Sequence, residues 1–193
     1  MIIVDDVLSP VDFNNLQNLV LSTEFPWYWQ SHVSLPPWCV ITDPRAIETF
    51  GWNHQVYNKE TNFKGDFLEA FAPILQQIKN QADTKIEFIR IRLSMKVYKK
   101  GFTENNYNLP HIDYNFPHKT VIFYLNDSDG PTWIFNEKFN GPEEPTKFTV
   151  GEKVDPKENR MILLDGLQYH TASNPINSDR RVILNVNYVE NKR

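Results

Sequence analysis

"IEFIRIRLSMKVY", residues 86–98, alternates apolar and polar side chains strictly from Ile89 onward. Successive side chains of a β-strand point to opposite faces of a sheet, so this run predicts a strand with one apolar and one polar face. The apolar positions are Ile89, Ile91, Leu93, Met95 and Val97, and the polar positions are Arg90, Arg92, Ser94, Lys96 and Tyr98. From residue 86 onward the chain is therefore expected to form mainly strands.

Further strand-like runs follow toward the C-terminus, separated by turn signals such as "DSDG" at 127–130. They are "KTVIFYLN" (119–126), "TWIFNE" (132–137), "KFTV" (147–150), "RMILLD" (160–165) and "RVILNVNYV" (181–189). Two helices are expected before them, one after the N-cap Ser9 and one across 65–83, where Pro73 predicts a kink or break. This order predicts a mainly β fold with flanking helices (α+β), built as a sheet sandwich or barrel.

Composition and charge exclude several classes of function. The chain has 193 residues, 40% of them hydrophobic, which fits one globular domain over 1–193. A net charge of −4 provides no general basic surface for nucleic acid, so no nucleic-acid partner is expected. No apolar run reaches the roughly 18 residues that a membrane helix needs. The single Cys39 excludes an intrachain disulfide and a cysteine-based metal cage. The first residues show no signal-peptide pattern, so we expect a cytoplasmic protein.

The loop "LPHIDYNFPH", residues 109–118, contains a candidate metal site. His111 and Asp113 are two residues apart, and in an extended chain both side chains would point to the same face. His170, which follows an apolar run, offers a third ligand. Two histidines and one carboxylate form the facial triad of non-haem Fe(II) oxygenases. A His-x-Asp pair alone is a weak signal, and a structural histidine at a strand end is the alternative.

The last apolar run, "RRVILNVNYV", also has two distinct faces. Val182, Leu184, Val186 and Tyr188 form one face, and Arg181, Ile183, Asn185 and Asn187 form the other. Polar side chains on the inner face of a barrel predict a functional cavity, and an arginine there would bind an anion such as a carboxylate. Alternatively, Arg180 and Arg181 are both surface cations at the start of a strand.

Taken in order, "MKVYKKG", "HID", "VIFYLN", "DGPTWIF", "RMILLDGLQYH" and "RRVILNVNYV" resemble the 2-oxoglutarate- and Fe(II)-dependent dioxygenases, in particular the prolyl-hydroxylase-like branch. The resemblance covers about residues 86–190, and Asp113 and His170 are 57 residues apart, as is usual in that branch. It implies a double-stranded β-helix (jelly roll) over 86–190. Residues 1–85 would form a helical and aromatic part that supports the barrel and the substrate entrance.

The resemblance also implies roles for individual residues. His111, Asp113 and His170 would bind Fe(II), and Arg181, in preference to Arg180, would bind the distal carboxylate of 2-oxoglutarate. The further residues expected at the 2-oxoglutarate site are Tyr124, Tyr98, Thr132 and Asn185. Arg92 and His54 are weaker candidates for contacts with the substrate.

The implied reaction is hydroxylation of an unactivated C–H bond with consumption of O2 and release of succinate and CO2. The first 85 residues do not match the prolyl hydroxylases closely and resemble members from phages and marine bacteria. A bacterial or phage-infected cell is therefore the expected source. The substrate, a protein or peptide side chain or a small molecule, and the oligomeric state stay open. The alternative is a cupin-like barrel that binds a metal or ligand without catalysis.

Overall fold

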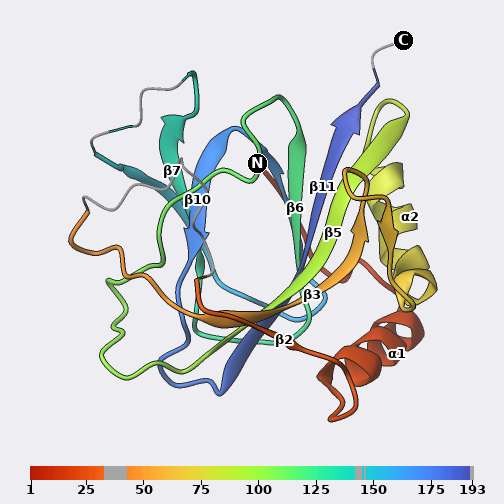
Figure 1. The fold of residues 1–193 in the computed structure, drawn as a ribbon, viewed down its shortest axis with the longest axis horizontal. Coiled ribbons are helices and arrows are strands. Elements are labelled where there is room, and N and C mark those ends of the chain that lie inside the picture. The colour runs from red at the N-terminus through yellow and green to blue at the C-terminus, as the bar shows by residue number, and fades with distance from the viewer. Residues whose placement is uncertain (33–42, 142–144, 146, 192–193) are drawn as a thin grey trace.

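The computed structural model describes residues 1–32, 43–141, 145 and 147–191. Cys39 lies outside these residues. In the described part, the strands form one large and one small antiparallel sheet, which face each other in Figure 1. The large sheet has the order β1 (Ile2–Val4), β9 (Met161–Asp165), β6 (Lys119–Tyr124), β11 (Arg180–Glu190), β5 (Ile86–Val97), β3 (Gly51–Asn58) and β2 (Tyr28–Gln30). β4 (Phe63–Lys64) pairs with β3, and the small sheet has the order β10 (Gln168–Ala172), β7 (Thr132–Lys138) and β8 (Val150–Val154).

The structure corrects one predicted strand and adds strands that the sequence did not predict. The strand predicted at 147–150 is displaced, because β8 begins at Val150. His170 was expected after a strand but lies within one, β10. β3 is an eight-residue strand, whereas only loops and short strands were expected between the two helices. Because β3 pairs with β5 and β1 pairs with β9, the N-terminal part contributes strands to the large sheet as well as covering it.

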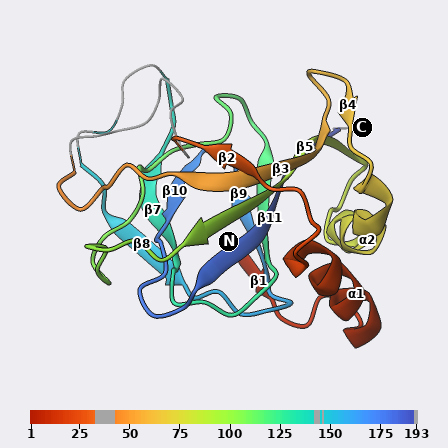
Figure 2. The same cartoon turned by 60° about the horizontal axis from the view of Figure 1, so that its bottom comes forward.

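The helices lie together on the outer face of the large sheet, away from β7, β8 and β10 (Figure 2). Helix α1 (Pro10–Leu21) begins as predicted, since the Ser9 side chain accepts a hydrogen bond from the Asp12 amide. The second predicted helix is divided into the 3-10 helix η1 (Leu68–Phe71) and α2 (Ala72–Asn80). Pro73 lies in the first turn of α2, where its missing N–H costs no hydrogen bond.

The main core lies between these helices and the large sheet. Its sheet side includes Leu93 of β5 and Val182, Leu184 and Val186 of β11, and its helix side includes Phe13, Leu16, Val20, Ile74 and Ile78. The apolar faces predicted for both strands therefore pack against the helices. Their polar faces point the other way, into the space between the two sheets. No helix of the described chain combines the length and apolar character that crossing a bilayer would need.

Candidate metal centre

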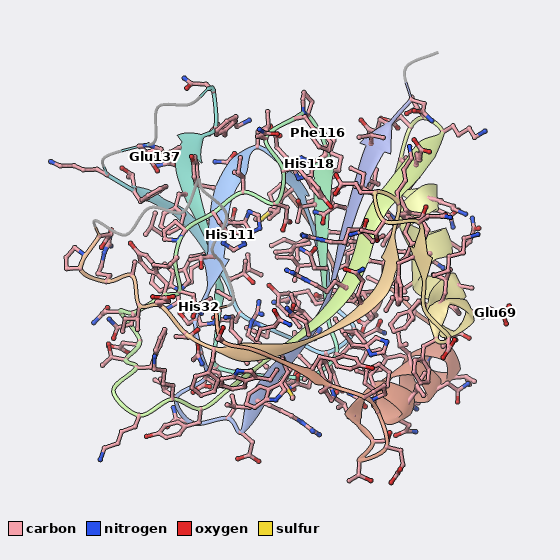
Figure 3. The ribbon with its side chains drawn as sticks, viewed as in Figure 1. His32, Glu69, His111, Phe116, His118 and Glu137 are labelled. Atoms are coloured by element: carbon pink, nitrogen blue, oxygen red, sulfur yellow. The ribbon has the colours of Figure 1, made fainter. Side chains whose placement is uncertain are left out.

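Two backbone hydrogen bonds bring the loop that carries His111 to strand β10. The His111 amide donates to the His170 carbonyl, and the His170 amide donates to the His111 carbonyl, each at 3.0 Å. Asp113 follows two residues later. His111, Asp113 and His170 then present one ligand atom each, and the three atoms lie within 4.8 Å of one another. Figure 3 places His111 on the inner side of β10, between the two sheets.

Both imidazoles are held by backbone carbonyls. The Nδ1 atom of His111 lies 3.0 Å from the Leu109 carbonyl oxygen, and Nδ1 of His170 lies 3.0 Å from that of Gln168. A proton on each Nδ1 leaves Nε2 with a free lone pair for a metal. Burial, together with the neighbouring His170, lowers the pKa of His111 to about 4. His111 is therefore neutral at physiological pH, which is the form that binds metals.

The Asp113 carboxylate, with its side chain 4% exposed, is surrounded by donors. Arg90 contacts Oδ1 at 2.6 Å, the Asn187 amide donates to Oδ2 at 2.9 Å, and the Thr120 hydroxyl donates at 3.2 Å. Burial alone would raise the pKa of Asp113, but the Arg90 guanidinium holds it well below its usual range. Two imidazoles and one ionised carboxylate could hold Fe(II) and leave coordination positions open on one side.

The triad lines a cavity between the sheets that is partly open to solvent. Arg181, 2% exposed, lines the same cavity, whereas the neighbouring Arg180 is exposed. The Arg181 guanidinium donates to the Thr132 hydroxyl at 2.7 Å, and the Tyr124 hydroxyl lies 2.7 Å from the same oxygen. Arg181 Nε is buried without a hydrogen-bond partner among the described residues, so this group is available to an anionic ligand.

The structure brings some of the other predicted residues to this cavity and leaves others outside. Asn185 lines it and donates to Asp113 Oδ2 at 3.3 Å, and Arg92 lines it from β5. Tyr98 is 54% exposed and lies outside the cavity, because β5 ends at Val97 and its alternation ends there. His54 is buried elsewhere, between Phe25 and Phe67, with Nδ1 2.8 Å from the Pro26 carbonyl oxygen.

Four residues around the triad were not singled out from the sequence. Arg90, Thr120 and Asn187 hold Asp113, and Lys96 lines the cavity. The strand alternation contains a signal for three of them, since Arg90 and Lys96 share the inner face of β5 with Arg92, and Asn187 shares that of β11 with Asn185. Thr120 lies in a mostly apolar run, and only the folded sheet identifies its contact.

His118, which was not assigned to the site from the sequence, is buried and belongs to this surrounding network. Its Nε2 lies 3.3 Å from the Thr120 hydroxyl, and its Nδ1 lies 2.8 Å from the Phe116 carbonyl oxygen. Gly166 permits this position, because a Cβ added there would lie 2.3 Å from the His118 ring. Figure 3 shows His118 beside Phe116.

No known protein-family model and no curated protein matches this chain. Solved structures match it over nearly its whole length. The non-haem α-ketoglutarate-dependent epimerase SnoN from nogalamycin biosynthesis is 13% identical, with 98% of this chain and 77% of that chain covered, at a TM-score of 0.63. A prolyl hydroxylase from Trichoplax adhaerens, in complex with a hypoxia-inducible-factor peptide, is 16% identical, with 98% and 83% covered, at 0.62.

The viral collagen prolyl hydroxylase of Paramecium bursaria Chlorella virus-1 has a similar length, with 99% of this chain and 96% of that chain covered, 16% identity and a TM-score of 0.50. The chain has the double-stranded β-helix fold of these 2-oxoglutarate enzymes. The predicted fold class, mainly β with flanking helices, is therefore confirmed. At these identities the likeness concerns the fold, and the function has to be argued from the residues in the cavity.

Proposed function

We propose that this protein is an Fe(II)- and 2-oxoglutarate-dependent dioxygenase that hydroxylates an unactivated C–H bond. One observation carries the proposal: the His111, Asp113 and His170 ligand atoms share a cavity with the buried guanidinium of Arg181. A metal triad and an anion-binding arginine in one pocket match a metal-chelating dicarboxylate such as 2-oxoglutarate. Structures of the same fold are 2-oxoglutarate-dependent enzymes, which supports the same assignment.

The triad would hold the metal. With 2-oxoglutarate bound, Fe(II) supplies activation of O2, one oxygen atom going to succinate as CO2 is released and the other to the substrate C–H bond. His111 and His170 are oriented for this by the Leu109 and Gln168 carbonyls, and Asp113 stays ionised next to Arg90. These contacts fix the three ligands before any ion arrives, which lowers the ordering cost of binding.

Arg181 would bind the distal carboxylate of 2-oxoglutarate with two parallel N–H donors. Thr132 accepts one hydrogen bond from the guanidinium and so fixes its plane, and the Tyr124 ring lies 5.5 Å from the guanidinium carbon. Burial of the Tyr124 hydroxyl raises its pKa, which keeps it protonated as a hydrogen-bond donor at neutral pH. Asn185 lies between this end and the metal and would contact the co-substrate or Asp113.

The substrate is a protein or peptide side chain or a small molecule. The two prolyl hydroxylases of this fold support the first class, and the epimerase SnoN from nogalamycin biosynthesis supports the second. No observation favours the cupin-like binding barrel, because binding alone gives no reason for an arginine beside an intact facial triad. A cytoplasmic location, in a bacterial or phage-infected cell, remains a prediction from the sequence.

The first test is anaerobic addition of Fe(II) to the apoprotein with 2-oxoglutarate, followed by visible absorption for the weak charge-transfer band of the metal chelate. We expect the band in the wild-type protein and none in His111→Ala. Arg181→Met should need at least tenfold more 2-oxoglutarate to reach half of the signal, because one charge-assisted contact is lost.

Arg180→Met is the matched control, since it removes the same charge from the exposed neighbouring position. It should titrate like the wild-type protein. Metal bound without a band, or equal 2-oxoglutarate affinity in the two arginine variants, would contradict the proposal.

A further inference from the structure

The cavity contains more positive charge than the metal and 2-oxoglutarate account for. Arg92, Lys96 and Arg181 line it, whereas Asp113 is the one carboxylate among its described lining residues. Asp113 is already paired with Arg90 at 2.6 Å. If 2-oxoglutarate binds as proposed, one of its carboxylates meets the metal and the other meets Arg181. Lys96 is then left without an anionic partner, and Arg92 shares the Asp113 carboxylate with Arg90, which already pairs with it.

Lys96 is deprived of water as well, and Arg92 is partly so. Lys96 is 5% exposed, and its Nζ has no hydrogen-bond partner among the residues described. The Nε of Arg92 is buried and equally unpartnered within that part of the chain. Burial, reinforced by Arg181 and Arg92, lowers the pKa of Lys96 to about 7. An unpaired buried charge is costly, so such groups persist where a ligand compensates them.

The strand register places the two cations on one wall. Arg92 and Lys96 lie on the same face of β5 with Ser94 between them, and all three line the cavity. Arg92 is opposite Asn185, which contacts the metal ligand Asp113, and Lys96 is opposite Arg181. The Ser94 side chain between them donates to Asn53 at 2.9 Å, and it is much shorter than the two cationic side chains on either side.

We propose that Arg92 and Lys96 form a second anion subsite above Ser94 that binds the carboxylate of the substrate. The substrate then carries a carboxylate, and we infer a small molecule because this subsite lies inside the cavity that also has to hold 2-oxoglutarate. Its carboxylate would lie on the β5 wall, and the rest of the molecule would extend from there toward the triad. This inference rests on the proposed function and adds the chemical class of the substrate to it.

The test uses the full chain with Zn(II) in place of iron, so that no turnover occurs, and saturating 2-oxoglutarate. Propionate and benzoate are each compared with propionamide and benzamide, which have nearly the same shape without the charge. The readout is the midpoint of thermal unfolding, with calorimetric titration of the pair that responds. We expect at least one carboxylate to raise the midpoint by 2 °C or more above its amide, and Arg92→Met and Lys96→Met to abolish the difference.

Lys100→Met is the matched control, since it removes an exposed lysine near the end of the same strand and should keep the wild-type response. Arg92→Gln and Lys96→Gln serve as second variants if either methionine variant fails to fold. A carboxylate that binds only the metal would act equally on wild type, Arg92→Met and Lys96→Met, and this result would overturn the subsite. The subsite would also be overturned if carboxylates raise the midpoint of the wild-type protein no more than amides do. The same holds if inorganic phosphate raises the midpoint and neither carboxylate does.

Titration of 2-oxoglutarate into the same Zn(II) proteins separates this inference from the proposed function. Arg92→Met and Lys96→Met should keep the wild-type affinity within threefold. A loss in Lys96→Met as large as that in Arg181→Met would assign Lys96 to the co-substrate and overturn the subsite. If the wild-type protein binds no 2-oxoglutarate at all, the proposed function fails first.

Discussion

At the scale of single residues, Asp113 shows how the metal centre is prepared by side chains that do not bind the ion. One of its oxygens faces Arg90, and the other accepts hydrogen bonds from Asn187 and Thr120. The side chain is nearly inaccessible to water, so these donors replace its hydration and keep it ionised. Residues of this kind fix the orientation of a ligand, and their removal weakens the metal without removing any of its ligands.

Asn187→Ala should therefore weaken binding of Mn(II) by about 10-fold or more. The variant removes the shortest amide contact of Asp113 Oδ2, at 2.9 Å, and leaves all three ligands in place. Calorimetric titration of Mn(II) measures the change. Asn80→Ala, at an exposed position of α2, is the control and should bind like wild type. Equal affinities in the two variants would show that Asn187 does not support the site.

Lys96 makes a second prediction, on the pH dependence of stability. Its pKa is lowered by burial to about 7 in the folded protein, against 10.5 in an exposed side chain. Between these values the unfolded chain keeps the proton that the folded chain releases, so the ligand-free protein should become more stable as pH rises from 7 to 9.5. The gain is up to about 1.4 kcal/mol per pH unit. Urea unfolding at both pH values should show it in wild type and not in Lys96→Met. A parallel pH dependence of the two proteins would contradict this assignment.

At the scale of the element, one face of β11 packs in the core and its other face lines the candidate site. Leu184 and its apolar neighbours pack against the helices, while Arg181 and Asn185 point into the cavity. Side chains in a strand alternate strictly, so adjacent residues serve different purposes. β5 has the same division, and the cations of its inner face are held against β11 by the shared register.

Leu184→Ala should therefore lower mainly the stability, and Asn185→Ala should lower mainly the affinity for metal and 2-oxoglutarate. Leu184 is fully buried in the core, and its truncation should cost about 2–5 kcal/mol of the free energy of unfolding through lost contacts and a cavity. Its effect on Mn(II) and 2-oxoglutarate affinity should stay within threefold. Asn185→Ala should weaken that binding and cost less stability. Urea denaturation and calorimetric titration of both variants test the separation, and a stability loss in Asn185→Ala as large as that in Leu184→Ala would contradict it.

At the scale of the whole molecule, the site depends on both sheets. His170 comes from β10 of the small sheet, Arg181 comes from β11 of the large sheet, and His111 and Asp113 come from the loop between β5 and β6. Binding across the two sheets links ligand affinity to global stability, because the unfolded chain has no such arrangement.

Mn(II) and 2-oxoglutarate together should thus stabilise the protein. At a ligand concentration about 100-fold above the dissociation constant, the gain is about 2.7 kcal/mol, which corresponds to a rise of roughly 5–10 °C in Tm for a chain of this length. Differential scanning calorimetry with both ligands, and after addition of EDTA, measures it. His111→Ala should show no rise. A rise of the same size in this variant would place the binding elsewhere.

The sequence alone predicts the candidate metal site and much of the local structure. Strict alternation in 89–97 and 181–189 predicts which side chains face the core, and the Ser9 cap predicts where the first helix begins. The types and spacing of His111, Asp113 and His170 indicate a metal site. These features depend on neighbours along the chain or on the period of a strand, and both can be recognised without the fold.

Which side chains come together at the cavity depends on the tertiary structure. Tyr98 fits the alternation but lies past the end of β5 and is exposed, and His54 is buried among aromatic rings away from the cavity. Thr120 and His118 join the metal centre through contacts that no local pattern predicts. The excess of positive charge at Arg92 and Lys96 also emerges only once two sheets enclose them. Their burial and pairing depend on strands that are distant in sequence, because sheet register and packing are set by the whole chain.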